Sequence, residues 1–199
     1  MYAYGFPCMI GLMCGIVYYE FSEILSRFRA RLETQSTFFN ANKILCELKI
    51  HSELYKLSYA VQDAMSLTCF FLFCYHMSSM YCVLSVFVLT KTEDIITAQI
   101  IEFILIIALM PPTIIGIIWC ASRINVQHQK IQKTIHLLLD HHTNLHNHKA
   151  EIITYLNRMK EKQFPVMSAC GVLELTPKLL FGLFGSLFTY GLLFLNLKR

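Results

Sequence analysis

The sequence Phe103-Ile-Leu-Ile-Ile-Ala-Leu-Met-Pro-Pro-Thr-Ile-Ile-Gly-Ile-Ile-Trp-Cys-Ala-Ser122 contains no aspartate, glutamate, lysine or arginine. An α-helix needs about 20 apolar residues to cross the roughly 30 Å hydrocarbon core of a bilayer. Three further charge-free stretches have comparable length, at residues 1–19, 64–90 and 179–197. The sequence therefore predicts an all-α, polytopic membrane protein with four transmembrane helices.

The overall composition agrees with a membrane protein, since 55% of the 199 residues are hydrophobic and only 15% are charged. A secretory signal peptide is the alternative interpretation of residues 1–19. That stretch has no basic residue ahead of its apolar run, contains Pro7, and is followed by Glu20 rather than by a small-residue cleavage site. We therefore interpret it as a transmembrane helix.

The basic residues orient the four predicted helices. Fourteen of the 17 lysines and arginines fall in two alternate loops, at residues 20–63 and 123–178, whereas the loop at 91–102 contains only Lys91. Loops rich in lysine and arginine remain in the cytoplasm. The two long loops are thus predicted to be cytoplasmic, the loop at 91–102 is predicted to be a short extracellular loop, and Met1 and Arg199 are predicted to be extracellular. This distribution explains the net charge of +4, so no nucleic-acid partner is needed to account for it. A nucleic-acid-binding protein would group its basic residues on one face with aromatic residues.

Both cytoplasmic loops show helical periodicity, with apolar residues about three, four or seven positions apart. We expect them to form long helical extensions of the membrane helices. Their apolar stripes must be buried, either against each other or against other subunits. The residues of the two stripes are Ile44, Leu48, Leu54, Leu57, Val61 and Met65 in the first loop, and Ile124, Ile131, Ile135, Leu138, Leu139, Ile152, Ile153, Leu156 and Met159 in the second.

A histidine-rich segment is the one pattern that suggests different chemistry. His142 and His146 have the i, i+4 spacing that can chelate a metal on a helix. A membrane hydroxylase or desaturase would need several such histidine boxes, and this chain has one. We therefore expect a solvated polar loop, with no enzymatic activity and no cofactor. The histidines of this segment are His136, His141, His142, His146 and His148.

The C-terminal thirty residues carry a more specific signature. Ser168-Ala-Cys-Gly leads through Leu173-Glu-Leu-Thr-Pro-Lys into the last apolar stretch, which contains Thr189-Tyr190, five apolar or small residues, and Asn196-Leu197. This pattern resembles the C-terminal signature of the arthropod gustatory receptors, which are seven-transmembrane chemoreceptors. In that family the last pair is glutamine-phenylalanine, and an aspartate usually stands where this chain has Thr176. The chain resembles the C-terminal half of such a receptor, so three N-terminal helices are expected to be missing.

The resemblance implies a gustatory receptor in the cell membrane, which detects a small-molecule tastant and conducts cations through a tetrameric pore. It places Asn196 and Leu197 at the gate, with Thr189 and Tyr190 deeper in the pore helix. It also implies an outward-facing ligand pocket and a structural turn at Cys170-Gly171. Two alternatives remain: a non-conducting fragment or accessory subunit, and a G-protein-coupled type of receptor. By position, the pocket residues would be Tyr4, Phe6, Tyr81, Phe87 and Glu102.

Overall fold

The computed structural model describes residues 2–35, 41–89, 97–144 and 150–197, apart from the side chains of a few residues at the ends of these segments. It is all-α except for one short hairpin, and four of its helices are long and apolar enough to cross a membrane. The elements are α1 (Tyr2–Gln35), α2 (Ala41–Leu89), α3 (Thr97–Asn144), α4 (Ala150–Glu161), β1 (Ser168–Ala169), β2 (Leu173–Glu174) and α5 (Pro177–Leu197).

Three of the helices are much longer than a bilayer is thick. α1, α2 and α3 contain 34, 49 and 48 residues, and thus extend about 50, 74 and 72 Å at 1.5 Å per residue. The hydrocarbon core is about 30 Å thick. Each of these helices therefore continues well beyond the membrane, as the periodicity of the two long loops predicts. α3 also begins earlier than its charge-free stretch, at Thr97 rather than Phe103.

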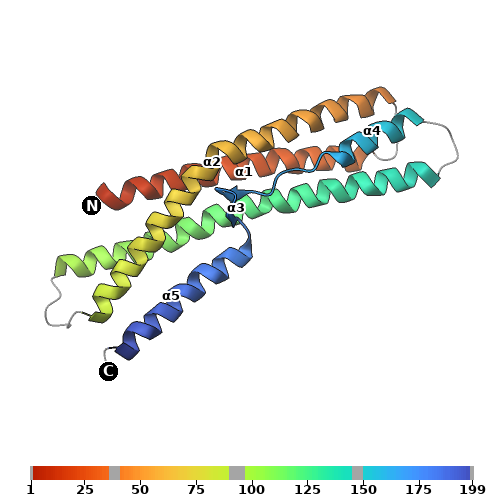
Figure 1. Ribbon diagram of the computed structural model, residues 1–199. Coiled ribbons are helices and arrows are strands. Elements are labelled where there is room, and N and C mark those ends of the chain that lie inside the picture. The colour runs from red at the N-terminus through yellow and green to blue at the C-terminus, as the bar shows by residue number, and fades with distance from the viewer. Residues whose placement is uncertain (1, 36–40, 90–96, 145–149, 198–199) are drawn as a thin grey trace.

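The helices form one elongated bundle with two different halves (Figure 1). α1 packs along α3 for most of its length, and α2 crosses both. In one half of the bundle, α4 packs on α2 and α3. In the other half, α5 contacts the same two helices. The N- and C-terminal ends lie at the same end of the bundle (Figure 1), as an even number of membrane crossings requires.

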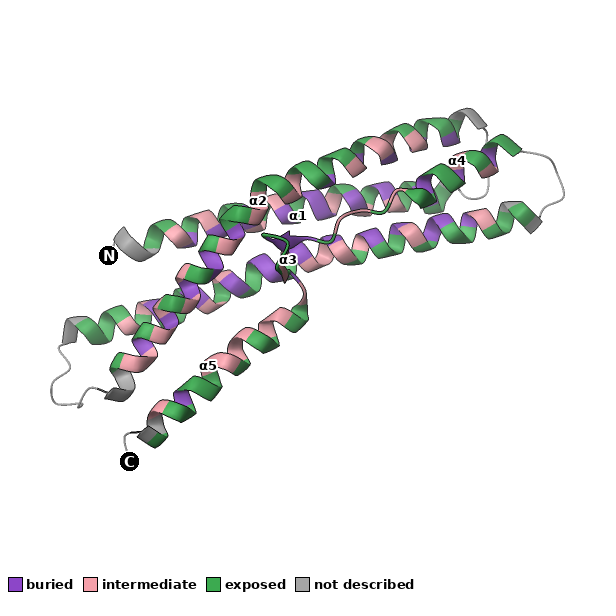
Figure 2. Cartoon of the chain, in the orientation of Figure 1, coloured by how far each residue is buried: buried purple, intermediate pink, exposed green. Residues whose placement is uncertain are grey.

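The core runs continuously through both halves and is built from α1, α2 and α3, of which α3 contributes most. Buried positions on α1 recur every three or four residues, which gives the helix a single buried stripe (Figure 2). Most of the apolar stripes predicted for the two long loops are buried within the chain, although Leu57 is 42% exposed. The α1 stripe consists of Cys14, Tyr18, Phe21, Leu25, Phe28 and Leu32.

The hairpin near the middle of the bundle is the element that the sequence did not predict. Its two strands pair antiparallel around Cys170 and Gly171, which both have positive φ, at 53° and 68°. The Val172 N–H donates a hydrogen bond to the Ala169 carbonyl at 3.1 Å, which closes a turn with Cys170 and Gly171 at its centre. Glycine adopts a positive φ without steric cost. Ser66 Oγ accepts a hydrogen bond from the Cys170 N–H at 2.7 Å, which ties this turn to α2. The expected structural turn at Cys170-Gly171 thus lies at the tip of the hairpin.

Candidate ligand cavity

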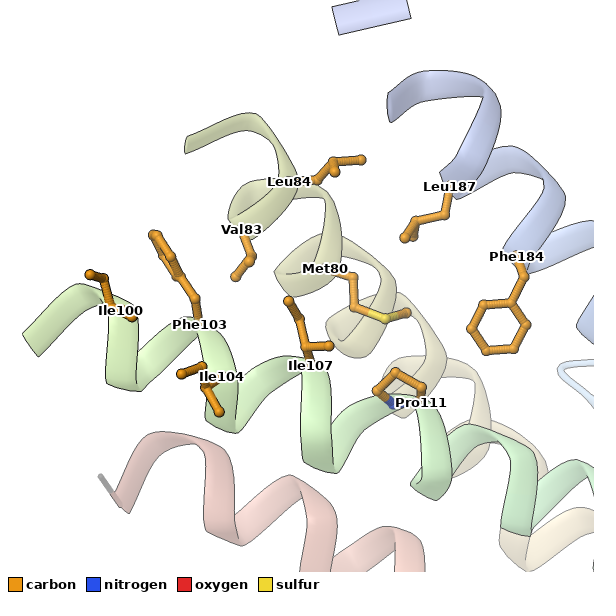
Figure 3. Close-up of a pocket in the computed structure, with 10 residues that line it drawn as sticks. All are labelled: Met80, Val83, Leu84, Ile100, Phe103, Ile104, Ile107, Pro111, Phe184 and Leu187. Carbon is orange, nitrogen blue, oxygen red and sulfur yellow. The ribbon is translucent and has the colours of Figure 1, made fainter. Parts of the chain in front are cut away.

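An apolar cavity of about 550 Å³ lies where α2, α3 and α5 diverge (Figure 3). The side chains that line it come from all three helices, and none carries a charge or a hydrogen-bonding group. Pockets of about 300 to 1,000 Å³ accommodate small organic ligands. The lining residues are Met80, Val83, Leu84, Ile100, Phe103, Ile104, Ile107, Pro111, Phe184 and Leu187.

A polar seam between α2 and α5 runs close to this cavity. The hydroxyl of Tyr81 lies 2.8 Å from Ser186 Oγ, and Ser186 donates its own proton to the Leu183 carbonyl, so Tyr81 is the donor. The rings of Tyr81 and Tyr190 meet edge to face, with 5.3 Å between centroids. The structure thus brings together one residue predicted for the ligand pocket, Tyr81, and one predicted for the pore, Tyr190.

Two of the other predicted pore residues, Thr189 and Asn196, are exposed on α5. Thr189 donates a hydrogen bond to the Gly185 carbonyl of its own helix (2.9 Å), and its side chain is exposed. Asn196 is exposed in the last turn of the helix. Leu197 is the last residue of α5, and its side chain lies outside the described part of the chain.

The structure describes the side chains of two of the remaining residues predicted for the ligand pocket. Phe6 is 71% exposed on α1, and Glu102 is exposed on α3. The side chains of Tyr4 and Phe87 lie outside the described part of the chain. Neither Phe6, Tyr81 nor Glu102 is among the residues that line the apolar cavity.

The sequence alone did not distinguish the residues that line the cavity from other apolar residues of the membrane helices. The α3 wall repeats every three or four positions, as in Ile100, Phe103, Ile104 and Ile107, but from Phe103 onward the residues between them are equally apolar. Residues facing a cavity, a neighbouring helix or lipid therefore look alike within a membrane span. Only the way in which the three helices diverge separates these groups.

A second group of functional interest lies in the other half of the bundle, where two buried histidines surround Phe164. The ring of His128 stacks on Phe164 with 4.2 Å between centroids and 11° between planes, and the ring of His51 meets Phe164 edge-on at 5.0 Å. Burial, reinforced by the positive charge of Lys162, lowers the pKa of His51 to about 4. Burial and the neighbouring His51 lower the pKa of His128 to about 3. Both rings are therefore uncharged at neutral pH.

The structure describes the side chains of two histidines of the histidine-rich segment. His136 and His141 are exposed on α3, whereas the side chains of His142, His146 and His148 fall outside the described residues. Among the residues that the structure describes, no three histidine, cysteine, aspartate or glutamate side chains are grouped so that they could hold a metal ion.

Comparison with known proteins gives one family. The sequence matches the 7tm Chemosensory receptor family over residues 1–196, which is nearly the whole chain. No curated protein matches it. The match covers all four membrane-type helices and the C-terminal sequence from Ser168 to Asn196. The chain therefore belongs to the 7tm chemosensory receptor family and is a multi-pass membrane chemoreceptor, which confirms the resemblance carried by its C-terminal signature.

Proposed function

We propose that this chemoreceptor is a tastant-gated, non-selective cation channel, in which four subunits surround a pore lined by α5. The observation that carries the proposal is the distribution of side chains around α5. The face that meets α2 and α3 includes Ser186, Leu187 and Tyr190. At 100° per residue, the exposed side carries a narrow strip of small and polar residues, namely Gly182, Gly185, Thr189 and Asn196. Large exposed apolar residues flank this strip, namely Phe181, Phe188, Leu192 and Leu193.

This strip of small and polar residues on α5 is poorly suited to contact with lipid. Polar groups at membrane depth are costly unless they face protein or a water-filled path. A path surrounded by four such faces satisfies this requirement. At its end, a ring of Asn196 amides would offer carbonyl oxygens to a partly dehydrated cation, and a ring of Leu197 side chains would narrow the closed pore.

The ligand proposal rests on the apolar cavity. A small, largely apolar tastant fits its volume and its lining. Because Phe184 and Leu187 of α5 form one wall, a ligand that prefers the cavity in one position of α5 would shift the helix toward that position. Movement of α5 would then link ligand binding to pore opening.

The decisive experiment records ligand-evoked currents from cells that express the chain with its partner subunits. Asn196→Ala is expected to change the reversal potential or the unitary conductance without changing surface expression. Phe188→Ala, which is exposed on another side of α5, is the matched control and should leave both quantities unchanged. If the Asn196→Ala channel keeps wild-type selectivity and conductance, α5 does not line the pore.

The cavity is tested in the same recordings. Ile107→Phe places a larger side chain at its wall and is expected to raise the ligand concentration needed for half-maximal response. Ile115→Phe makes the same change at an exposed position of α3 away from the cavity. Equal responses from both variants would place the ligand elsewhere.

Two other functions predict different outcomes. A non-conducting fragment or accessory subunit would assemble with related subunits and carry no current of its own. A G-protein-coupled type of receptor would have the opposite membrane orientation, with Arg199 in the cytoplasm.

A further inference from the structure

A second cavity, of about 570 Å³, lies in the other half of the bundle and differs from the first in being polar. One face of α3 supplies its floor, and the end of α4, the segment that follows α4 and the exit of the hairpin supply its walls. The residues that matter for its chemistry are Asn125, His128 and Gln132 of α3, Lys160 of α4, Phe164, and Glu174 of β2.

Hydrogen bonds to α3 hold the wall of this cavity in place. Gln132 Nε2 donates to the Lys162 carbonyl at 3.0 Å, and Asn125 Oδ1 accepts from the Met167 N–H at 3.1 Å. These two bonds fix both ends of the segment that contains Phe164, and the Phe164 ring in turn stacks on His128. The cavity is therefore part of the packed structure.

Two polar groups of the cavity residues lack partners. His128 is 6% exposed, and its Nε2 has no hydrogen-bond partner among the residues that the structure describes. The Nδ2 of Asn125 is buried and also without one. Leaving such groups unpaired costs free energy, so a polar ligand that satisfies them gains affinity.

The cavity lining carries one lysine and one glutamate, and both side chains are exposed. Lys160 and Glu174 come from different elements, and neither forms a salt bridge with any residue that the structure describes. His128 adds no charge near neutral pH, because burial keeps its pKa low. Glu174 would repel a polyanion, and Lys160 would repel a polycation. A molecule that carries one charge of each sign can pair with both residues.

We propose that this cavity binds a compact zwitterion, with its anionic group at Lys160, its ammonium group at Glu174, and further hydrogen bonds to His128 and Asn125. Glu174 lies three residues before Pro177, the first residue of the membrane helix α5, so the cavity reaches the level of the lipid headgroups. A phosphoethanolamine headgroup and a free zwitterion of the same chemistry both fit. The site is independent of the proposed channel and of its tastant.

The test uses the full chain purified in detergent and two probes, glycerophosphoethanolamine and phosphatidylethanolamine, with phosphatidylglycerol as the anionic comparison. Binding is measured by native mass spectrometry for the lipids and by saturation-transfer NMR for the soluble probe. Lys160→Glu and Glu174→Lys are each expected to weaken binding by about fivefold, and the double exchange should restore it because the two charges are again of opposite sign. Glu161→Lys and Lys178→Glu, which lie outside the cavity lining, are the controls.

The outcomes separate the two sources of the ligand. Binding of both probes supports a free zwitterion, and binding of phosphatidylethanolamine alone supports a lipid headgroup. Equal binding of phosphatidylglycerol, or single variants that bind like the controls, overturns the proposal. Thermal unfolding midpoints of all variants show whether a loss of binding reflects a loss of folding.

Discussion

At the scale of single residues, His51 and His128 show how position changes chemistry. Both side chains are buried, and the charged group that acts on His51, Lys162, is itself positive. His51 also lowers the pKa of His128, and the two rings flank the same phenylalanine. The folded protein therefore binds protons at these sites only in strong acid.

Acidification is consequently expected to destabilise the protein. The pKa of both groups is lowered in the folded state from an ordinary value of 6.5, so below about pH 6.5 the unfolded chain takes up protons that the folded chain does not. The free energy of unfolding should fall by up to about 1.4 kcal/mol per pH unit for each histidine, down to the folded values near 4 and 3. Unfolding in detergent at stepwise pH from 7.5 to 5 measures this slope.

Two variants isolate the contribution of the buried rings. His128→Gln is expected to make the dependence on pH shallower, whatever it does to stability at pH 7.5. His136→Gln alters an exposed histidine on the same helix and serves as the control. A slope unaffected by His128→Gln would show that other groups dominate the acid response.

At the scale of elements, the α1–α3 interface depends on a glycine that has no space for a side chain. A Cβ at Gly11 would overlap Thr113 Cγ2, and Thr113 is fixed because its hydroxyl donates to the Leu109 carbonyl at 2.7 Å. Gly15, one turn further along α1, has nothing within 4 Å of the same position. The two glycines therefore make a matched pair in one helix.

Gly11→Ala is expected to destabilise the protein by about 1–3 kcal/mol through overpacking. Gly15→Ala should be neutral or stabilising by about 0.5–1 kcal/mol, since alanine favours a helix over glycine. Thr113→Ser removes the opposing methyl group and should rescue Gly11→Ala. Unfolding by dodecyl sulfate in mixed micelles gives the free energies, and equal effects of the two alanine variants would argue against close contact at Gly11.

The docking of α5 on α2 depends on fewer interactions. The bond between Tyr81 and Ser186 is one, and the Tyr190 ring against Tyr81 is another. Tyr81→Phe removes the hydroxyl and keeps the ring contact, and Ser186→Ala removes the acceptor. A double-mutant cycle in the same micelle assay is expected to give a coupling of about 0.6 kcal/mol, as for other hydrogen bonds between membrane helices. Additive effects would mean that the two hydroxyls do not interact in the membrane.

At the scale of the whole molecule, the two halves of the bundle have different surroundings. The half that contains α5 carries many exposed large apolar residues, including Phe6, Ile104, Phe181 and Phe188, which suits lipid or neighbouring subunits. The other half carries the two loops rich in lysine and arginine. The charge distribution predicts that this second half lies in the cytoplasm.

Chemical labelling in cells tests the orientation. Cys46 and Cys170 are exposed, and both belong to the segments predicted to be cytoplasmic. A membrane-impermeant maleimide should label them only after permeabilisation, whereas an epitope tag placed after Arg199 should be reached on intact cells. Labelled cysteines are assigned by peptide mass spectrometry. Labelling of Cys46 on intact cells would reverse the predicted topology.

The sequence by itself determined the number of membrane-type helices, the helical nature of the long loops and the family. These features are written in local patterns: charge-free stretches of sufficient length, apolar residues every three or four positions, and a C-terminal motif. The continuous helix from Ala41 to Leu89 needed no further information, since no proline or glycine interrupts it. The start of α5 was also foreseeable from Pro177, which fits the first turn of a helix.

Only the tertiary structure decided which residues meet. Tyr81 reaches Ser186 across 105 positions of sequence, and His51 meets Phe164 across more than a hundred. Both cavities arise where helices diverge, and the hairpin is held by contacts from α2. Within an apolar membrane span, side chains that face a cavity, a helix or lipid are chemically alike. Their roles follow from the relative placement of helices, which depends on packing between distant segments and leaves no periodic trace in the sequence.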